Sequence, residues 1–143
     1  MSRQDLPSTR RSLPIALIRA REAVMGPIRE MLAGTGLTEQ QWRVLRVLDE
    51  FGAQDATQLA ARAGLIASSL TRIVQSMVTE GLVTRSTSME DRRRQVIAIA
   101  DRGQAILVEN KATATRIAEG YRAKLGAKDY ERLLDLLEQL SLD

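Results

Sequence analysis

Three arginines in succession, Arg92, Arg93 and Arg94, carry the most distinctive chemistry in this sequence. They lie in the stretch "MEDRRRQVIAIADRG", where Asp91 precedes them and an apolar, strand-like run follows. Guanidinium groups at the mouth of a β-strand suit contact with nucleic-acid phosphates, and a narrow minor groove attracts inserted arginine. Asp91 can orient one guanidinium through a bidentate pair. A solvated turn with local ion pairs is the alternative, but three neighbouring cations at one hairpin tip favour a DNA contact.

A second candidate surface lies on the helix predicted over Leu65–Leu82. Its apolar side chains share one face, which consists of Leu70, Ile73, Val74, Met77 and Val78. Polar side chains make the other face, which consists of Ser68, Thr71, Arg72, Gln75 and Thr79. Together with the short helix predicted over Asp55–Gly64, this helix forms a helix-turn-helix unit whose second helix can enter a major groove.

The first turn of that second helix suits a close approach to base edges. Ala67, Ser68 and Ser69 have small side chains, and the two hydroxyls can bond to bases or phosphates. Arg72, one turn further on, can reach a guanine or a phosphate. An ordinary helical hairpin with a solvated polar face is the alternative. The β-hairpin that follows directly favours the DNA-binding interpretation, because it would complete a winged helix-turn-helix.

Composition restricts the other functions that this chain can have. The 143 residues are about the size of one domain, and 44% of them are hydrophobic, which is enough to bury a core. The chain has neither histidine nor cysteine, so the commonest general base and the usual metal ligands are missing. The sequence also contains no Gly-rich phosphate loop and no nucleophile elbow. We therefore expect no enzyme, no metal site and no cofactor.

Further helices must position these surfaces, and apolar residues at seven-residue spacing mark two of them. We expect a helix over Ser12–Ala33, kinked but not stopped at Gly26-Pro27, and a last helix over Lys128–Leu140. Their apolar stripes are too extensive for one winged domain to bury, which predicts a homodimer. The other expected elements are a helix from its N-cap Thr38 to Gly52, a hairpin of "LVTRS" and "RQVIAIA", and a helix from its cap Asp101 to about Leu125.

The wing stretch resembles the signature of the MarR (multiple antibiotic resistance regulator) family, which is an Asp-x-Arg element, an apolar strand ending in Leu-Thr, and a glycine. Asp91 and Arg93 match the first element, Ile99 stands in for the leucine, and Gly103 matches the glycine. Ala100 replaces the usual threonine. "LTEQQWRVLRVL" and "LAARAGLIASSLTRIVQSMVTEGLV" are similar to the rest of the family's DNA-binding region, so the resemblance covers nearly the whole chain.

The resemblance implies a ligand-responsive repressor whose effector is often an aromatic acid, held between the dimer helices and the winged domain. An aromatic carboxylate needs a cation and a flat apolar wall, which Trp42 with Arg21 or Arg46 can supply. Alternatively, Trp42 packs in the core. The arginines would then pair with nearby acids, which are Glu22, Glu30 and Glu39. Sensing by thiol oxidation is excluded, and sensing of zinc lacks its usual ligands.

The sequence therefore predicts a mainly α fold with a small β-hairpin, as one MarR-type domain over residues 1–143. Residues 12–34 and 101–143 are the expected dimerisation helices, and residues 37–100 the winged helix-turn-helix. The expected partners are double-stranded DNA with a pseudo-palindromic operator, a second copy of the chain and a small aromatic acid. No membrane span or secretory signal is apparent, so we expect a cytoplasmic protein. The resemblance implies that it regulates aromatic-compound catabolism. The predicted DNA contacts are Ala67, Ser68, Ser69, Thr71, Arg72, Gln75, Asp91, Arg92, Arg93 and Arg94. A helical interaction module without DNA binding is the alternative, and it would show no salt-dependent affinity for a duplex.

Overall fold

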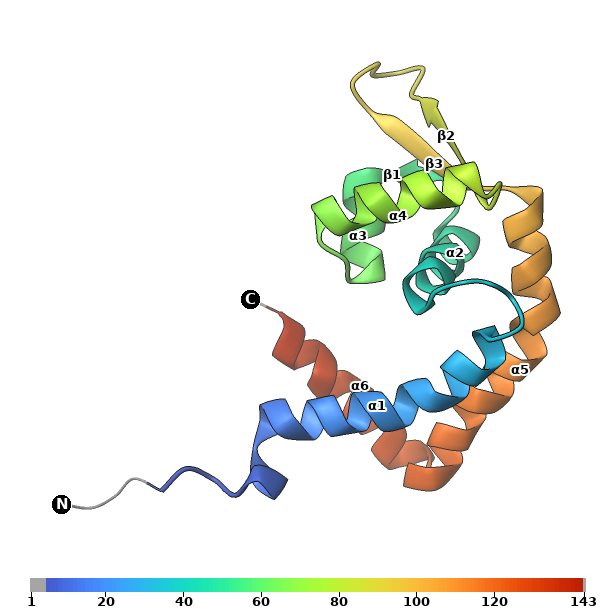
Figure 1. Cartoon of the computed structure of the whole chain (residues 1–143). Coiled ribbons are helices and arrows are strands. Elements are labelled where there is room, and N and C mark those ends of the chain that lie inside the picture. The colour runs from blue at the N-terminus through green and yellow to red at the C-terminus, as the bar shows by residue number, and fades with distance from the viewer. Residues whose placement is uncertain (1–4, 143) are drawn as a thin grey trace. The chain divides into compact units, whose positions relative to one another are not determined.

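The computed structural model describes residues 5–142, which form a mainly helical fold with one small sheet (Figure 1). The predicted order of four helices, a hairpin and two more helices is confirmed. The elements are a 3₁₀ helix η1 (Thr9–Arg11), α1 (Leu13–Leu32), α2 (Glu39–Phe51), β1 (Gln54–Asp55), α3 (Ala56–Ala63), α4 (Ala67–Thr79), β2 (Val83–Thr87), β3 (Gln95–Ile99), α5 (Asp101–Leu125) and α6 (Ala127–Ser141).

The chain divides into two compact units, and α5 contributes residues to both. The first unit contains the described residues up to Met31 and those from Ala114 onward. The second unit is Leu32–Thr113, which holds the helix-turn-helix, the hairpin and most of the buried core.

The core of the second unit forms where α2, α3 and α4 pack with one another and with the sheet. Its most deeply buried large side chains are Leu45, Leu48, Leu59, Leu70, Met77, Leu82 and Ile97. The face of α4 predicted to be apolar is buried or half-buried as expected. This burial fixes which side of α4 remains available to solvent.

The sheet has three antiparallel strands in the order β1-β3-β2, where the sequence predicted only a two-stranded hairpin. In the hairpin, Val83 pairs with Ile99 and Thr87 with Gln95. The additional strand β1 pairs Gln54 with Ile97 of β3. Two polar residues carry no period-2 signal, so β1 depends on this pairing with a distant strand.

Gly103, in the first turn of α5, lies against the start of the wing. A Cβ atom there would be 2.3 Å from the Leu82 carbonyl oxygen and 2.9 Å from Leu45 Cδ2. The Ala100 backbone N–H donates to the same Leu82 carbonyl at 3.0 Å. The glycine therefore lets α5 approach the backbone that leads into β2.

The expectation that Asp101 caps α5 is wrong by one residue. The Gln104 backbone N–H donates to the Ala100 carbonyl at 2.9 Å, so Ala100 occupies the N-cap position and Asp101 begins the helix. The Asp101 carboxylate still lies in the first turn, where the positive end of the helix dipole favours it.

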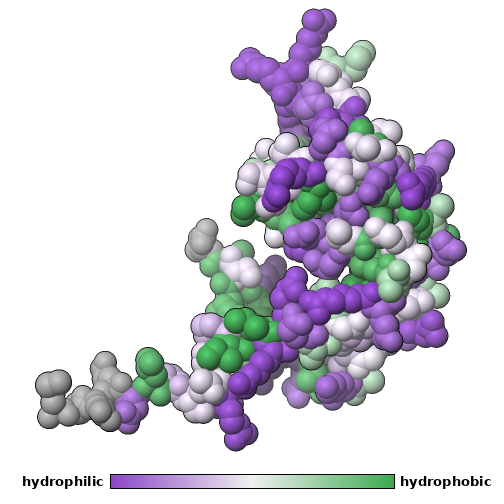
Figure 2. Space-filling model, in the orientation of Figure 1, coloured by the Kyte–Doolittle hydropathy of each residue, from purple (hydrophilic) through white to green (hydrophobic). Residues whose placement is uncertain are grey.

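The first unit combines α1, α6 and the C-terminal part of α5, and it buries little within one chain. As expected, α1 continues through Gly26 and Pro27 without stopping. Large apolar side chains are exposed on α1 at Leu13, Leu17, Ile18 and Val24, and on α6 at Leu133, Leu134, Leu136 and Leu140. Figure 2 shows hydrophobic surface over α1.

Side-chain contacts join the helices of this unit: the Tyr121 hydroxyl of α5 donates to the Val24 carbonyl of α1, and Arg122 of α5 pairs with Glu131 of α6 at 3.3 Å. Partial burial raises the pKa of that phenol. Across residues 5–142, no helix is both long and apolar enough to cross a membrane.

Candidate nucleic-acid interface

The helix-turn-helix is built from α3, the turn at Gly64 and α4. The Asp55 side chain caps α3 by accepting the Gln58 backbone N–H at 2.8 Å. Gly64 ends α3 in the left-handed conformation, with φ at 65°, and its N–H returns to the helix carbonyls. The predicted glycine turn is therefore confirmed, and α4 begins at Ala67, two residues later than the sequence suggested.

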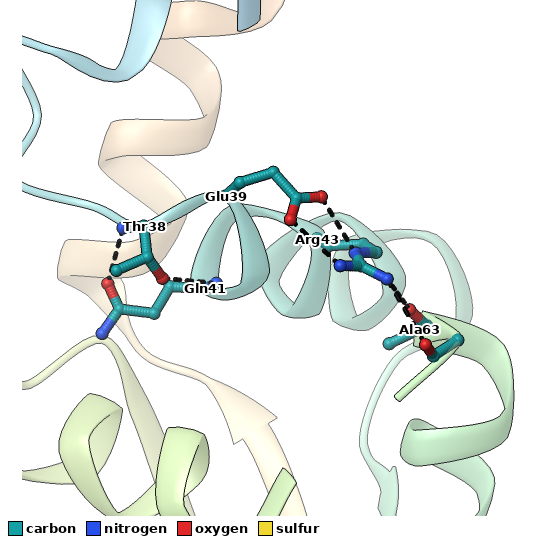
Figure 3. Close-up of polar contacts among 6 residues, drawn as sticks. Thr38, Glu39, Gln41, Arg43 and Ala63 are labelled. Carbon is teal, nitrogen blue, oxygen red and sulfur yellow. Dashed lines mark hydrogen bonds and ion pairs between the residues drawn. The ribbon is translucent and has the colours of Figure 1, made fainter. Parts of the chain in front are cut away.

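Arg43 of α2 holds this turn from outside the helix-turn-helix itself (Figure 3). Its Nη1 donates to the carbonyl of Ala63 at 2.8 Å and to that of Gly64 at 3.4 Å. The Glu39 carboxylate accepts from Nε at 3.1 Å and from Nη2 at 3.0 Å, which fixes the plane of the guanidinium. A cation at the C-terminus of α3 also complements the negative end of that helix dipole.

Gln41, two residues earlier on α2, connects the same helix to α4. Its side-chain carbonyl accepts the Thr38 backbone N–H at 3.0 Å, and the Thr38 hydroxyl accepts the Gln41 backbone N–H at 3.1 Å (Figure 3). This is a reciprocal capping box. The buried Gln41 amide then donates to Ser76 Oγ and Glu80 Oε2, both at 3.4 Å. Through Gln41 and Arg43, α2 therefore contacts both α4 and the C-terminal end of α3.

The polar face of α4 is exposed as predicted, with one exception. Of the predicted contacts, Ser69 is half-buried, whereas the others on this helix are exposed, namely Ala67, Ser68, Thr71, Arg72 and Gln75. The Thr71 hydroxyl donates to the Ala67 carbonyl at 3.1 Å. Gln75 accepts a 2.7 Å hydrogen bond from Arg85 of β2, which joins the helix to the wing.

The wing is the β2–β3 hairpin, and hydrophilic surface covers much of it (Figure 2). Arg92 and Arg93 are exposed in the loop between the strands, and the Arg93 side chain is 95% accessible. Asp91 accepts the Arg93 backbone N–H at 3.0 Å, but its only contact with the guanidinium is at 3.8 Å. The expected bidentate pair is therefore absent between these two residues, because Asp91 orders the loop backbone instead.

Arg94 lies at the base of the loop. Its Nη2 donates a hydrogen bond to Asp55 Oδ2, and the two side chains form an ion pair. Hydrogen-bond donors hold the pKa of the Asp55 carboxyl below its ordinary value. The larger effect is the hydrogen bond from the Gln58 backbone N–H, and the second is that from Arg94. The same pairing raises the pKa of Arg94. Asp55 thus caps α3 and ties the wing to the helix-turn-helix.

The residues predicted to bind a ligand fall in different parts of the fold. Trp42 is 6% exposed and belongs to the core of the second unit, which is what the packing alternative expected. Arg46 is exposed on the same helix, and Arg21 lies on α1 in the first unit. Among residues 5–142, no cluster of three or more acids could hold a metal ion.

Sequence reasoning missed the residues that position this interface rather than those that form it. Gln41 carried a readable signal, because Thr38-x-x-Gln41 is the capping-box pattern. Arg43 and the Asp55–Arg94 pair had none. Their partners lie 20 and 39 residues away along the chain.

The chain is similar to known proteins in both sequence and structure. A model of the MarR family matches residues 37–94. The homoprotocatechuate degradative operon repressor of Escherichia coli is 41% identical over 131 residues, which cover 90% of this chain and 86% of the repressor. The structure of NadR in complex with 4-hydroxyphenylacetate matches with a TM-score of 0.83 and 32% identity over the whole of both chains. The transcriptional repressor CouR bound to a 23-mer DNA duplex matches with a TM-score of 0.83 and 27% identity, covering 99% of this chain and 100% of CouR.

Proposed function

Because this chain belongs to the MarR family, we propose that it is a dimeric, DNA-binding repressor of transcription that responds to a small aromatic acid. One observation carries the proposal. A polar helix face and an arginine-bearing wing belong to the same compact unit, and side-chain contacts fix both. CouR, which matches this chain over nearly its full length, has been solved on a DNA duplex. We place the protein in the cytoplasm, with its operator, and assign it no enzymatic activity.

The two surfaces divide the work of DNA binding. The start of α4, with Ser68 and Arg72, enters the major groove and reads base edges. Arg92 and Arg93 contact phosphates or the minor groove, and so they add affinity for any sequence. Residues 37–100 form this DNA-binding region. Arg94 contributes mainly by holding the wing against α3 through Asp55.

Selection of bound duplexes from a random pool, followed by fluorescence anisotropy, tests this function. The selected duplex should bind at least a thousandfold more tightly than a scrambled duplex of equal length, within the range of ~10³–10⁷ for specific binders. A helical interaction module without DNA binding would enrich no sequence and show no salt-dependent affinity for either duplex.

The dimer is formed by residues 12–34 and 101–143. The support is the set of large apolar side chains that α1 and α6 leave exposed within one chain, together with the absence of any buried residue on α6. Contiguous apolar surface of this kind marks an interface. Light scattering at micromolar concentration should give twice the chain mass, and a monomer would contradict the proposal.

The effector is an aromatic carboxylate, with Arg21, Trp42 and Arg46 as the predicted contacts. NadR, at 32% identity, has been solved with 4-hydroxyphenylacetate, which is a ligand of this class. Trp42 is the only tryptophan of the chain, so its fluorescence reports one place. Titration with 4-hydroxyphenylacetate, homoprotocatechuate and benzoate should quench that signal and release the selected duplex. If none does either at millimolar concentration, Trp42 serves packing alone.

A further inference from the structure

The N-cap of α4 is occupied by an apolar residue, Ile66. Its backbone is extended, with φ at −78° and ψ at 150°, and its side chain makes no capping hydrogen bond. The preceding helices of the same unit follow the usual rule, because Thr38 caps α2 and Asp55 caps α3 through side-chain oxygens. Isoleucine is among the poorest N-cap residues, since it leaves the first helix N–H groups without a side-chain acceptor.

Packing within the chain does not account for this choice. The Ile66 side chain is 69% exposed, whereas its neighbour Leu65 is half-buried and Leu70, one turn on, is 1% exposed. Ile66 therefore combines an unfavourable cap with an apolar surface left in water. Sequences that break a local rule in this way commonly do so where a partner binds.

The position of Ile66 identifies the partner surface. Ile66 directly precedes Ala67 and Ser68, which are small and exposed, so nothing bulky on the first turn stands between it and an approaching surface. In helix-turn-helix proteins, the N-terminal residues of the second helix meet base edges in the major groove. On the proposed function, Ile66 is presented to those edges.

We propose that Ile66 recognises thymine in each operator half-site by packing against the C5-methyl group. This inference rests on the proposed function of α4 as the DNA-reading helix. In the major groove the four bases present hydrogen-bond donors and acceptors, and the thymine methyl is the one apolar group among them. An exposed apolar side chain there is complemented by thymine, and it leaves donors or acceptors of the other bases unsatisfied.

The size of the effect follows from burial of one methyl group. Removal of a buried methyl lowers affinity by about fourfold, which corresponds to about 0.8 kcal/mol. In a symmetric dimer both half-sites contribute, so removal of both methyls should lower affinity by somewhat more than tenfold.

Replacement of each thymine by deoxyuridine in the duplex selected with the wild-type chain tests the contact, because uracil differs only by that methyl group. Binding is measured by anisotropy for wild type, Ile66→Val and Ile66→Ser. When uracil replaces thymine at one symmetric pair of positions, wild type and Ile66→Val should each lose affinity by somewhat more than tenfold. Ile66→Ser should bind the thymine duplex more weakly and be insensitive to uracil at that pair.

Thermal unfolding distinguishes this role from a structural one. Serine can cap α4, so Ile66→Ser should raise Tm by a few degrees while it lowers operator affinity. Wild-type binding that is insensitive to uracil at every position, or equal binding by Ile66→Ser, would overturn the inference and leave the proposed function standing. Failure of wild type to bind any duplex would overturn both.

Discussion

Replacement of Gly103 by alanine should destabilise the fold, although alanine is the better helix former. The added Cβ would lie 2.3 Å from the Leu82 carbonyl oxygen, 2.9 Å from Leu45 Cδ2 and 3.2 Å from Ile99 Cγ1. The nearest of these atoms is backbone, which cannot rotate away. Overpacking of this kind costs about 1–3 kcal/mol, and the helix propensity of alanine returns about 1 kcal/mol. Because the nearest atom is backbone, we take the upper part of that range, about 2–3 kcal/mol, and expect a net loss of about 1–2 kcal/mol.

Thermal unfolding at a fixed protein concentration measures this loss, because the stability of a dimer depends on concentration. A domain of this size changes Tm by roughly 3 °C per kcal/mol, so Gly103→Ala should lower Tm by about 3–6 °C. Gly120 is the matched control, since it lies on the same helix with no atom of its own chain within 4 Å of an added Cβ. Gly120→Ala should raise Tm by about 2–3 °C. An equal rise for both variants would refute the account of how α5 packs against the wing.

Three further predictions concern contacts that hold or form the interface. Arg43→Met removes the donor to the Ala63 carbonyl and leaves Glu39 without this partner. Tm should therefore fall by an amount equivalent to about 1 kcal/mol, and the ratio of operator affinity to random-duplex affinity should decrease. Because the folded protein lowers the pKa of Asp55, this carboxylate stabilises the fold above its unfolded pKa of about 3.9, and the stabilisation is lost as pH falls through the folded pKa. Asp55→Asn keeps a capping side chain, so below about pH 4 its free energy of unfolding should depend less steeply on pH than that of wild type. Arg93→Ala should weaken binding to all duplexes alike and reduce the log–log salt slope by about one unit, as anisotropy at several salt concentrations would show.

The parts of the fold that the sequence predicts are those governed by local chemistry. Thr38 and Asp55 are strong N-cap residues, and Gly64 supplies a left-handed C-cap, so the ends of α2 and α3 are readable within a few residues. The apolar face of α4 repeats at helical spacing and is buried as that spacing requires. The exposed arginines of the wing loop follow from the turn between two β-prone runs.

Long-range contacts account for what the sequence did not predict. β1 exists because Gln54 pairs with Ile97, which is far along the chain. Asp91 is adjacent to the arginine run, yet Asp55 is the acid that engages Arg94, because the sheet brings α3 next to the base of the wing. Adjacency in sequence therefore identified Asp91, which lies 3.8 Å from Arg93 Nε, but it could not identify Asp55 as the partner of Arg94. A pattern of residue types identifies which side chains are exposed more reliably than which ones meet.

On the proposed function, α4 reads sequence while the wing adds affinity without reading it. The most direct measurement is an anisotropy titration of wild type and Arg72→Ala on the selected and the scrambled duplex between 50 and 200 mM salt, a range over which phosphate contacts change affinity strongly. We expect Arg72→Ala to reduce the difference in binding free energy between the two duplexes by about 1–3 kcal/mol. Binding to the scrambled duplex, and its salt slope, should stay almost unchanged. An equal loss on both duplexes, with a shallower salt slope, would make Arg72 a phosphate contact and contradict the assignment of sequence reading to this face of α4.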